Sequence, residues 1–331
     1  MKQLIYILLV TFLPLYFSGC SSKQYYEPND TVGDYEVDTI DHDETIVDFN
    51  ADGATLENHK FISKDGVTKD SLEDGYKFIN NSDGIIIAAN DESTLLVKDK
   101  NKIDKYKFDK NIISASLKGK YIALGFIDNS IMLYDRDLKK KIFKEYLQVS
   151  LVNDIKIANP MFLSSVILYP TLDGKVVIVD IAKKGIIKTI NIDPQSSINN
   201  VMFLSTIGDT LVAATPKKLF TFVNGAINIK DFDIKHIIVS DKYIFIATLE
   251  GEIIKFNEEL KRKGSQKFKF AKFHALASGK YIYALESQEY LIQLDGELKD
   301  SNIYDFSFNN EEKVITIGDK LYFEDKSITL E

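Results

Sequence analysis

The sequence predicts an all-β chain that forms a seven-bladed β-propeller with four-stranded blades, and three observations lead to this prediction. Hydrophobic residues make up 45% of the 331 residues, with 17 Tyr, 21 Phe and no Trp, and a composition rich in aromatic and β-branched residues favours strands. A pair of short apolar runs joined by a polar turn recurs seven times. The turns contain Asp, Asn, Gly and Pro, which end strands and start hairpins.

The repeated unit is an apolar run, a polar turn and a second apolar run that often ends in Asp or Asn. In one unit, Tyr121 to Gly125 is followed by a turn at Asp128 to Ser130 and then by Ile131 to Asp135. The first runs begin near residues 85, 121, 166, 211, 243, 281 and 314, which gives an average spacing of about 38 residues. A propeller blade takes about 40 residues, so each unit is expected to be one blade.

The apolar runs are continuous, which is typical of strands that are covered on both faces. Inner strands of a propeller lie between neighbouring blades, and small residues such as Ala123, Gly125 and Ala247 would let the blades converge near the axis. A more polar hairpin follows each unit and would supply the half-solvated outer strand. A β-sandwich or an open solenoid is the alternative arrangement of the same strands, and six or eight blades are alternatives to seven.

The last unit is one strand short, because only Leu321 to Phe323 and Ser327 to Leu330 follow its first run. We expect strands near residues 45–49 and 54–62 to pair with it, so that both ends of the domain close the ring and no sheet edge is left at the junction. The propeller domain is therefore predicted to span residues 45–331.

Residues 1–19 have the features of an export signal. Lys2 precedes an uncharged, mostly apolar run of 14 residues from Leu4 to Phe17 that contains Pro14. This run is short for a membrane-spanning helix, which needs about 20 residues. The chain's single cysteine, Cys20, follows directly after Ser18 and Gly19, so no disulfide and no cysteine metal site is expected.

The residues Phe17-Ser18-Gly19-Cys20 resemble the lipobox of bacterial lipoproteins, which more often has Leu at the position of Phe17. The resemblance implies that residues 1–19 are removed and that Cys20 is acylated, and several acyl chains anchor a protein stably because each buried methylene contributes about 0.8 kcal/mol. Ser21, rather than Asp, follows the cysteine, which favours the periplasmic face of the outer membrane over the inner membrane. The alternative is an uncleaved signal anchor.

Residues 20–44 are predicted to be an acidic, flexible tether. No Lys or Arg occurs between Lys23 and Lys60, while Asp and Glu are frequent and apolar residues are sparse up to Thr45. Such a segment repels itself and stays solvated, so we expect a spacer between membrane and propeller. A docking strip for a basic partner is the alternative.

Asp48, Asn50 and Asp52 form the pattern D-x-N-x-D-G, which matches the first half of a calcium-binding loop. The twelfth position of that loop would be His59, where a bidentate Glu is expected. A turn between two strands is the simpler interpretation, so these three residues are a weak calcium candidate.

Other chemistry is not indicated. The four histidines lack the spacing of metal ligands, no nucleophile, zincin or phosphate-loop motif is present, and no cofactor is expected. A formal charge of −8 and a pI near 5.2 argue against a nucleic-acid partner. The basic clusters Lys139 to Lys141 and Lys261 to Lys263 fall on predicted outer hairpins and are interpreted as solvated turns.

The unit Gly174 to Asp180, which leads to a hairpin at Gly185, resembles the PQQ-like and WD40-like propeller repeats. Combined with the lipobox, it resembles the BamB family of outer-membrane assembly lipoproteins. The Trp of the quinoprotein repeat is missing, so quinone binding is not expected. The family resemblance implies a scaffold whose inter-blade loops contact the subunit that inserts outer-membrane barrels.

These observations lead to the hypothesis of a non-catalytic, membrane-anchored periplasmic scaffold that binds protein partners of the cell envelope, in the manner of the BamB family. One alternative is an accessory lipoprotein of a periplasmic respiratory enzyme system. Another is a propeller enzyme of the lactonase or lyase type, which would need acids, histidines or metal ligands at the mouth of the central channel.

Overall fold

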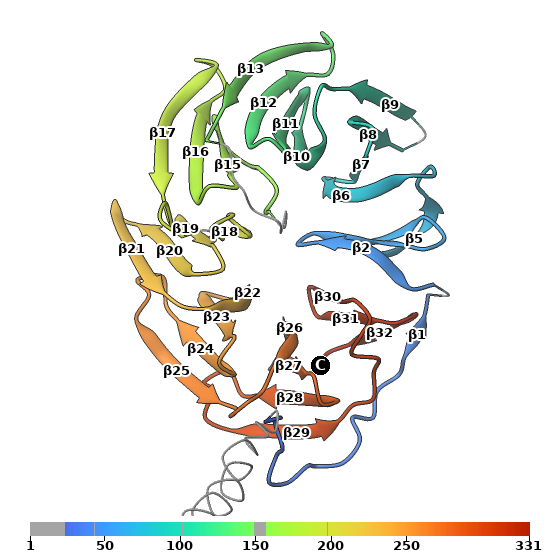
Figure 1. The fold of residues 1–331 in the computed structure, drawn as a ribbon, viewed down its shortest axis with the longest axis vertical. Helices are drawn as coiled ribbons and strands as arrows, with labels where there is room; N and C mark the ends of the chain where they lie inside the picture. Colours follow the sequence, from blue (N-terminus) through green and yellow to red (C-terminus); the bar gives the residue numbers. More distant parts are fainter. Residues whose placement is uncertain (1–23, 43, 101, 149–156, 197) are drawn as a thin grey trace, which may run out of the picture.

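The chain forms a ring of eight antiparallel four-stranded sheets around a central axis (Figure 1). The computed structural model describes residues 24–331 except 43, 101, 149–156 and 197. Every regular element in this part of the chain is a strand, and none of the described residues belongs to a helix long and apolar enough to cross a membrane.

The blades are numbered in chain order, with the innermost strand first. Blades 1 to 4 contain β2 (Ile46–Asn50), β3 (Gly53–Leu56), β4 (Lys60–Ser63) and β5 (Gly66–Ser71); β6 (Tyr76–Ser82), β7 (Ile85–Asn90), β8 (Thr94–Asp99) and β9 (Lys102–Lys107); β10 (Ile112–Lys118), β11 (Tyr121–Phe126), β12 (Ser130–Asp135) and β13 (Lys140–Tyr146); and β14 (Met161–Leu163), β15 (Val166–Pro170), β16 (Lys175–Asp180) and β17 (Gly185–Asn191).

Blades 5 to 8 continue in the same order, and blade 8 takes its outermost strand from the N-terminal part of the chain. They contain β18 (Phe203–Ile207), β19 (Thr210–Ala214), β20 (Lys218–Val223) and β21 (Ala226–Asp231); β22 (Ile234–Ser240), β23 (Tyr243–Thr248), β24 (Glu252–Phe256) and β25 (Arg262–Lys267); β26 (Phe273–Ser278), β27 (Ile282–Glu286), β28 (Tyr290–Leu294) and β29 (Ser301–Asp305); and β30 (Val314–Ile317), β31 (Lys320–Phe323), β32 (Lys326–Thr329) and β1 (Ile40–Asp41).

The prediction of seven blades is wrong, because the ring has eight. The seven units found in the sequence are blades 2 to 8, and the strands expected near residues 45–49 and 54–62 form blade 1 instead of completing the last unit. Blade 1 lacks the apolar run that marks the other blades, because its second strand, Gly53–Leu56, is fully buried but has a single large apolar side chain. A Cβ atom on Gly53 would lie 2.0 Å from the carbonyl oxygen of Ile62 and 2.4 Å from the ring of Phe78, so blade packing requires a small residue there.

The ring is closed by β1, which pairs antiparallel with β32 through Ile40 opposite Ser327 and Asp41 opposite Lys326. The next residue, His42, is buried, and its ring nitrogens lie 2.9 Å from the carbonyl oxygen of Glu44 and 3.0 Å from that of Lys326. The N-terminal and C-terminal parts of the chain therefore meet in blade 8, but the strand that pairs with β32 is neither of the strands expected near residues 45–49 and 54–62 and comes from the segment predicted to be a tether.

Residues 24–42, which we call the strap, lie against blades 7 and 8 (Figure 1). The backbone N–H of Val32 donates to Ile303 (2.8 Å), that of Tyr35 donates to Asp305 (3.1 Å), and Asp305 donates back to Gly33 (2.9 Å). Asp34 thereby forms a parallel bridge with Asp305 on the outer edge of β29. The described part of the acidic segment is thus packed on the propeller, whereas its composition favoured a solvated spacer.

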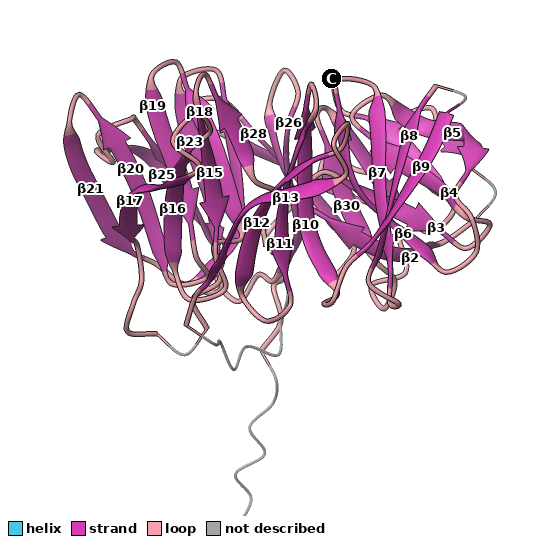
Figure 2. Ribbon diagram, turned by 90° about the horizontal axis from the view of Figure 1, so that it is seen from above, coloured by secondary structure: helices cyan, strands magenta, loops and turns pink. Residues whose placement is uncertain are grey.

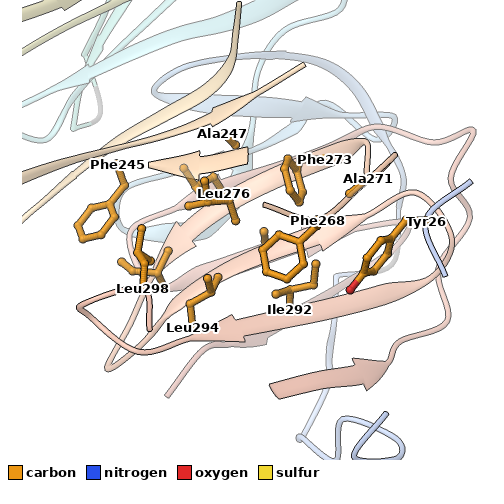
Figure 3. Packing of buried hydrophobic residues seen from close by; sticks show 13 residues of the cluster. Tyr26, Phe245, Ala247, Phe268, Ala271, Phe273, Leu276, Ile292, Leu294 and Leu298 are labelled. Atoms are coloured by element: carbon orange, nitrogen blue, oxygen red, sulfur yellow. The ribbon is translucent and has the colours of Figure 1, made fainter. Parts of the chain in front are cut away.

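Two tyrosines hold the strap in place. Tyr26 is 7% exposed, and its ring meets the ring of Phe268 edge to face, with centroids 5.9 Å apart (Figure 3). It meets the ring of Tyr290 in the same way, also with centroids 5.9 Å apart. Farther along, Tyr35 packs in the same way against Tyr283 and Tyr304. These aromatic contacts supply the burial that the acidic residues around them cannot.

The hydrophobic cores lie between blades, as expected for strands covered on both faces. In the core between blades 5 and 6, Val212 and Ala214 of β19 pack with Ile244 and Ile246 of β23. Polar contacts add to this packing: the hydroxyl of Tyr169 donates to the carbonyl oxygen of Met132 across blades 3 and 4 (2.9 Å). Each blade is therefore held by its two neighbours.

Replacement of Tyr26 by Ala should release the first part of the strap and lower the free energy of unfolding by about 3 kcal/mol, because a buried aromatic ring is lost. Urea denaturation would measure the loss, and hydrogen exchange at residues 26–35 should become faster. Tyr25 is the matched control, since it is the adjacent tyrosine and is 49% exposed. Equal effects of Tyr25→Ala and Tyr26→Ala would contradict the proposed attachment.

The strap should also be sensitive to alkaline pH. Burial, with smaller effects of Glu286 and Tyr290, raises the pKa of Tyr26 from 10.0 to about 12. A raised pKa means that the stabilisation is complete below the unfolded pKa and is lost as the pH rises toward the folded pKa. Unfolding free energies should therefore fall less steeply between about pH 10 and about pH 12 in Tyr26→Phe than in the native chain, and equal slopes would exclude this effect.

Candidate functional site

The ring has two faces, which carry different turns. The face that we call the strap face bears the turns between second and third strands and the connections between blades, including residues 268–272, which Tyr26 contacts. The opposite face, which we call the channel face, bears the other turns and the C-terminus, at the top of Figure 2. A ligand or partner would meet a different set of loops on each face.

A cavity of about 460 Å³ lies at the axis, toward the channel face. Its walls are the innermost strands β6, β10, β14 and β18 of blades 2 to 5, together with the turn between β2 and β3. Just over half of the lining residues are polar (Asn, Ser, Asp and Lys), and the others are apolar. The cavity is therefore the mouth of the central channel.

Asn159, just before β14, joins four blades across this channel. Its Nδ2 donates to Oδ2 of Asp52 in blade 1 (2.6 Å) and to the carbonyl oxygen of Ile79 in blade 2 (3.1 Å), while its Oδ1 accepts from the N–H of Ala115 in blade 3 (2.9 Å). A single amide thus satisfies backbone groups on inner strands that do not pair with each other. Its hydrogen bonds make this side chain structural.

A second set of polar contacts joins blades 2 and 3 at the channel wall. Nδ2 of Asn80 donates to Oγ of Ser116 (2.8 Å) and to the carbonyl oxygen of Ala115 (3.0 Å), and the N–H of Leu117 donates to Oγ of Ser82 (3.0 Å). Inner strands of neighbouring blades have no ladder between them, so these side chains satisfy the backbone groups that face the axis.

Asp52 lies at the wall of the channel. Its side chain opens to the channel, but the surrounding protein desolvates the carboxylate and raises its pKa, an effect that the hydrogen bond from Asn159 and the charge of Lys64 partly offset. Asp48 has a raised pKa for the same primary reason, namely burial. The two carboxyls lie in a hairpin whose geometry is set by hydrogen bonds.

The calcium candidate forms this hairpin turn. Nδ2 of Asn50 donates to the carbonyl oxygen of Phe78 (2.9 Å), and its Oδ1 accepts from the N–H of Asp52 (2.8 Å), so both amide atoms serve the fold. Asn50 also pairs with Gly53 across the turn between β2 and β3. Within the part of the chain that the structure describes, no group of three His, Cys, Asp or Glu residues could hold a metal ion.

The predicted lipidation site cannot be placed in the same way. Cys20 and the lipobox residues Phe17, Ser18 and Gly19 lie outside the described residues. Sequence reasoning missed Asn159 and Tyr26, which have clear structural roles. Tyr26 stands among acids and Asn159 stands in a connection, so neither belongs to a repeated pattern.

The outer edges of blades 4 and 5 carry a patch of exposed apolar side chains. Ile227 is 52% exposed, and Ile229 lies two positions on, so both point to the same side of β21 as their cross-strand partners Phe222 and Phe220. Phe220 packs toward blade 4, so this side borders the cleft between the two blades. We call Ile187, Ile227 and Ile229 the rim patch.

Contact across this cleft is made by Lys188 of β17, whose Nζ lies 5.1 Å from the centroid of the Phe222 ring. The adjacent Ile187 is exposed on the same outer strand. In Figure 1, β17 and β21 follow each other along the outside of the ring. Within the described part of the chain, β17 and β21 are the outermost strands of their sheets. The rim patch thus combines unpaired outer strand edges with exposed apolar side chains.

Removal of the Asn159 side chain should destabilise the ring. Asn159→Ala leaves the N–H of Ala115 and the carbonyl oxygen of Ile79 without this partner, and each buried group left unsatisfied costs about 1–3 kcal/mol. Urea denaturation would measure the change. Asn302→Ala, at an exposed position of β29 where Nδ2 donates to Oε1 of Gln293 (3.2 Å), is the control and should change stability by less than about 0.5 kcal/mol. Similar losses in both variants would refute a bridging role.

Comparison with known proteins gives relatives in sequence and in structure. The chain is 27% identical over 364 aligned positions to the plasminogen-binding protein PgbB of Helicobacter pylori strain J99. This alignment covers 96% of this chain and 66% of the relative. PgbB of strain 26695 is 26% identical over 308 positions, covering 79% of this chain and 56% of the relative. The chain therefore spans less than two thirds of the length of these relatives. No family model matches the sequence.

Many solved structures share the fold, and two of them serve as examples. BamB from Moraxella catarrhalis has a TM-score of 0.67 and 14% identity, covering 89% of this chain and 99% of that chain. The C-terminal WD40 domain of Sif2 has a TM-score of 0.64 and 12% identity, covering 90% and 99%. At these identities the likeness concerns the fold alone. The chain is a β-propeller similar to BamB and to WD40 domains, which confirms the resemblance expected from its repeats.

Proposed function

We propose that the chain is a non-catalytic scaffold that is anchored in the cell envelope and binds protein partners. The observation that carries this proposal is the similarity to PgbB along 96% of the chain, because that relative is named for binding a protein. The propeller fold shared with BamB supports it, since rigid blades present long loops and strand edges to a partner.

The rim patch is the partner site in this proposal. An extended segment of a partner can add to the outer edge of β21 by backbone hydrogen bonds, while Ile227 and Ile229 receive its apolar side chains. The strap provides the precedent within the molecule, because residues 32–35 bond to the outer edge of β29 in this way. The mechanism is therefore β-augmentation of a propeller blade.

Plasminogen is the first candidate partner, because the relatives in sequence are named for it. Outer-membrane assembly proteins are the second candidate, by the likeness in fold to BamB. The anchor in this proposal is acylated Cys20 at the periplasmic face of the outer membrane, with the inner membrane as the alternative. The roles in a respiratory enzyme system or as a lactonase or lyase stay predictions from the sequence.

Binding of plasminogen to the immobilised chain, measured by surface plasmon resonance, tests the proposal. Ile227→Asp with Ile229→Asp should weaken binding at least about tenfold, which corresponds to 1.4 kcal/mol, because charges replace the apolar contacts. Ile103→Asp is the matched control, since Ile103 is an exposed isoleucine on β9, the corresponding outer strand of blade 2.

An equal loss for both variants would contradict the rim patch as the site. If the native chain does not bind plasminogen, the first partner is wrong, and crosslinking in cells with the same variants then tests the second. Crosslinking that recovers no envelope protein would overturn the scaffold proposal.

A further inference from the structure

We propose that the strap face contacts the lipid bilayer directly at the boundary of blades 6 and 7, through a patch formed by Tyr25, Leu249, Phe270 and the lysines Lys269 and Lys272. We call these residues the bilayer patch. The inference rests on the proposed anchor at Cys20 and goes beyond it, since the anchor alone assigns no surface of the propeller to the membrane.

The first argument is the reach of the chain. Tyr26 is fixed between Phe268 and Tyr290, and it follows Cys20 by six residues. Six residues span at most about 20 Å even when fully extended. An acylated Cys20 therefore keeps the Tyr26 contact, and with it the turn at residues 268–271, close to the bilayer surface.

The second argument is the conformation of Phe270. Its φ is +68°, a left-handed conformation that is strained for a bulky side chain. Among the described residues, the apolar side chains with such a φ are Leu260, Leu298 and Phe270, and the first two are buried whereas Phe270 is 36% exposed. The two leucines are compensated by packing in the core, whereas the ring of Phe270 is held at the surface, where it is open to an external contact.

The turn that carries Phe270 is attached to the hydrophobic core between blades 6 and 7. Phe268 is buried in the cluster of Figure 3, its N–H donates to Gly251 (2.8 Å), and Ala271 donates to its carbonyl oxygen (3.1 Å). These contacts fix the two ends of the turn. The side chain between them is therefore presented outward by a rigid support.

Leu249 extends the apolar surface on the neighbouring turn between β23 and β24, where it is 60% exposed. The two turns touch through their backbones, because a Cβ atom on Gly251 would lie 2.3 Å from the carbonyl oxygen of Phe268. Tyr25 adds a third exposed side chain beside the fixed Tyr26. The apolar part of the patch thus consists of side chains on two touching turns and of Tyr25, next to the residue that attaches the strap.

The charges of this region suit anionic lipid. Nζ of Lys269 lies 4.7 Å from the centroid of the Phe270 ring, and neither Lys269 nor Lys272 has an ion-pair partner among the described residues. The nearby Lys267 is paired with Glu250 (3.4 Å). Glu286 is buried and accepts from the N–H of Lys272 (2.9 Å), so the other exposed acids next to the patch are Glu289, on the turn between β27 and β28, and Glu27, which follows Tyr26.

A bilayer fits this combination better than a protein would. Exposed aromatic and aliphatic tips flanked by lysines are the composition that enters the lipid interface. The same anchor that places the turn at the membrane would keep a large protein partner away from it. The occupant that we assign is therefore a membrane surface containing anionic lipid.

The absence of Trp from the chain allows a direct test. Phe270→Trp and Leu249→Trp, introduced singly into the full chain, provide one fluorophore each in protein purified from membranes and reconstituted on phosphatidylethanolamine and phosphatidylglycerol vesicles. Their emission should shift to shorter wavelength, and lipids with brominated acyl chains should quench about half of it, because interfacial side chains reach about 5–10 Å into the bilayer.

Leu138→Trp is the control, because Leu138 is exposed on the turn between β12 and β13 of the channel face, and its emission should not be quenched. Flotation of the same vesicles reports attachment separately. Protein that floats but shows equal, weak quenching at positions 270 and 138 overturns the bilayer patch and leaves the anchor intact. Protein that does not float overturns both. A shift at position 270 on addition of plasminogen, without quenching by lipid, would assign the patch to a protein instead and overturn the inference.

Discussion

The structure depends on the mutual burial of neighbouring blades. The middle strands of each blade are covered on both faces by the two neighbouring blades, so a ring that stayed open would expose two apolar sheet faces to water. The last junction is of this kind: Ile315 and Tyr322 of blade 8 pack against Leu56 and Ile62 of blade 1. The pairing of β1 with β32 and the buried His42 hold this junction, so a few residues of the strap secure a contact on which the whole ring relies.

The same constraint explains what could be predicted from the sequence and what could not. Strands buried on both faces have continuous apolar runs, and the runs in β7 to β31 revealed seven blades. The second strand of blade 1 is equally buried, but Phe78 and Ile62 approach its backbone so closely that Gly53 and small neighbours are required. The apolar run that marks the other blades is therefore missing from this strand. The count of blades was therefore wrong for a reason that lies in packing.

Contacts between residues that are far apart in the sequence could not be predicted from local patterns. Asn159 and Asp52 are 107 positions apart, and nothing near either residue indicates the other. For the acidic strap the reason is different. Its average composition is that of a solvated segment, while its attachment to the propeller comes from two individual rings, Tyr26 and Tyr35. Composition describes the mean of a segment, whereas attachment depends on the few side chains that find a site.

In the proposed function each of these surfaces has a separate role. The strap and its contacts occupy blades 7 and 8, while β17 and β21 lie on the other side of the ring from β1 (Figure 1). Because the strap covers the outer edge of β29 over residues 32–35, that edge is closed to a partner, and the rim patch stays accessible when the strap face is against a membrane. A rigid ring held by one edge can therefore present the opposite edge outward, which is the property that a membrane-anchored scaffold requires.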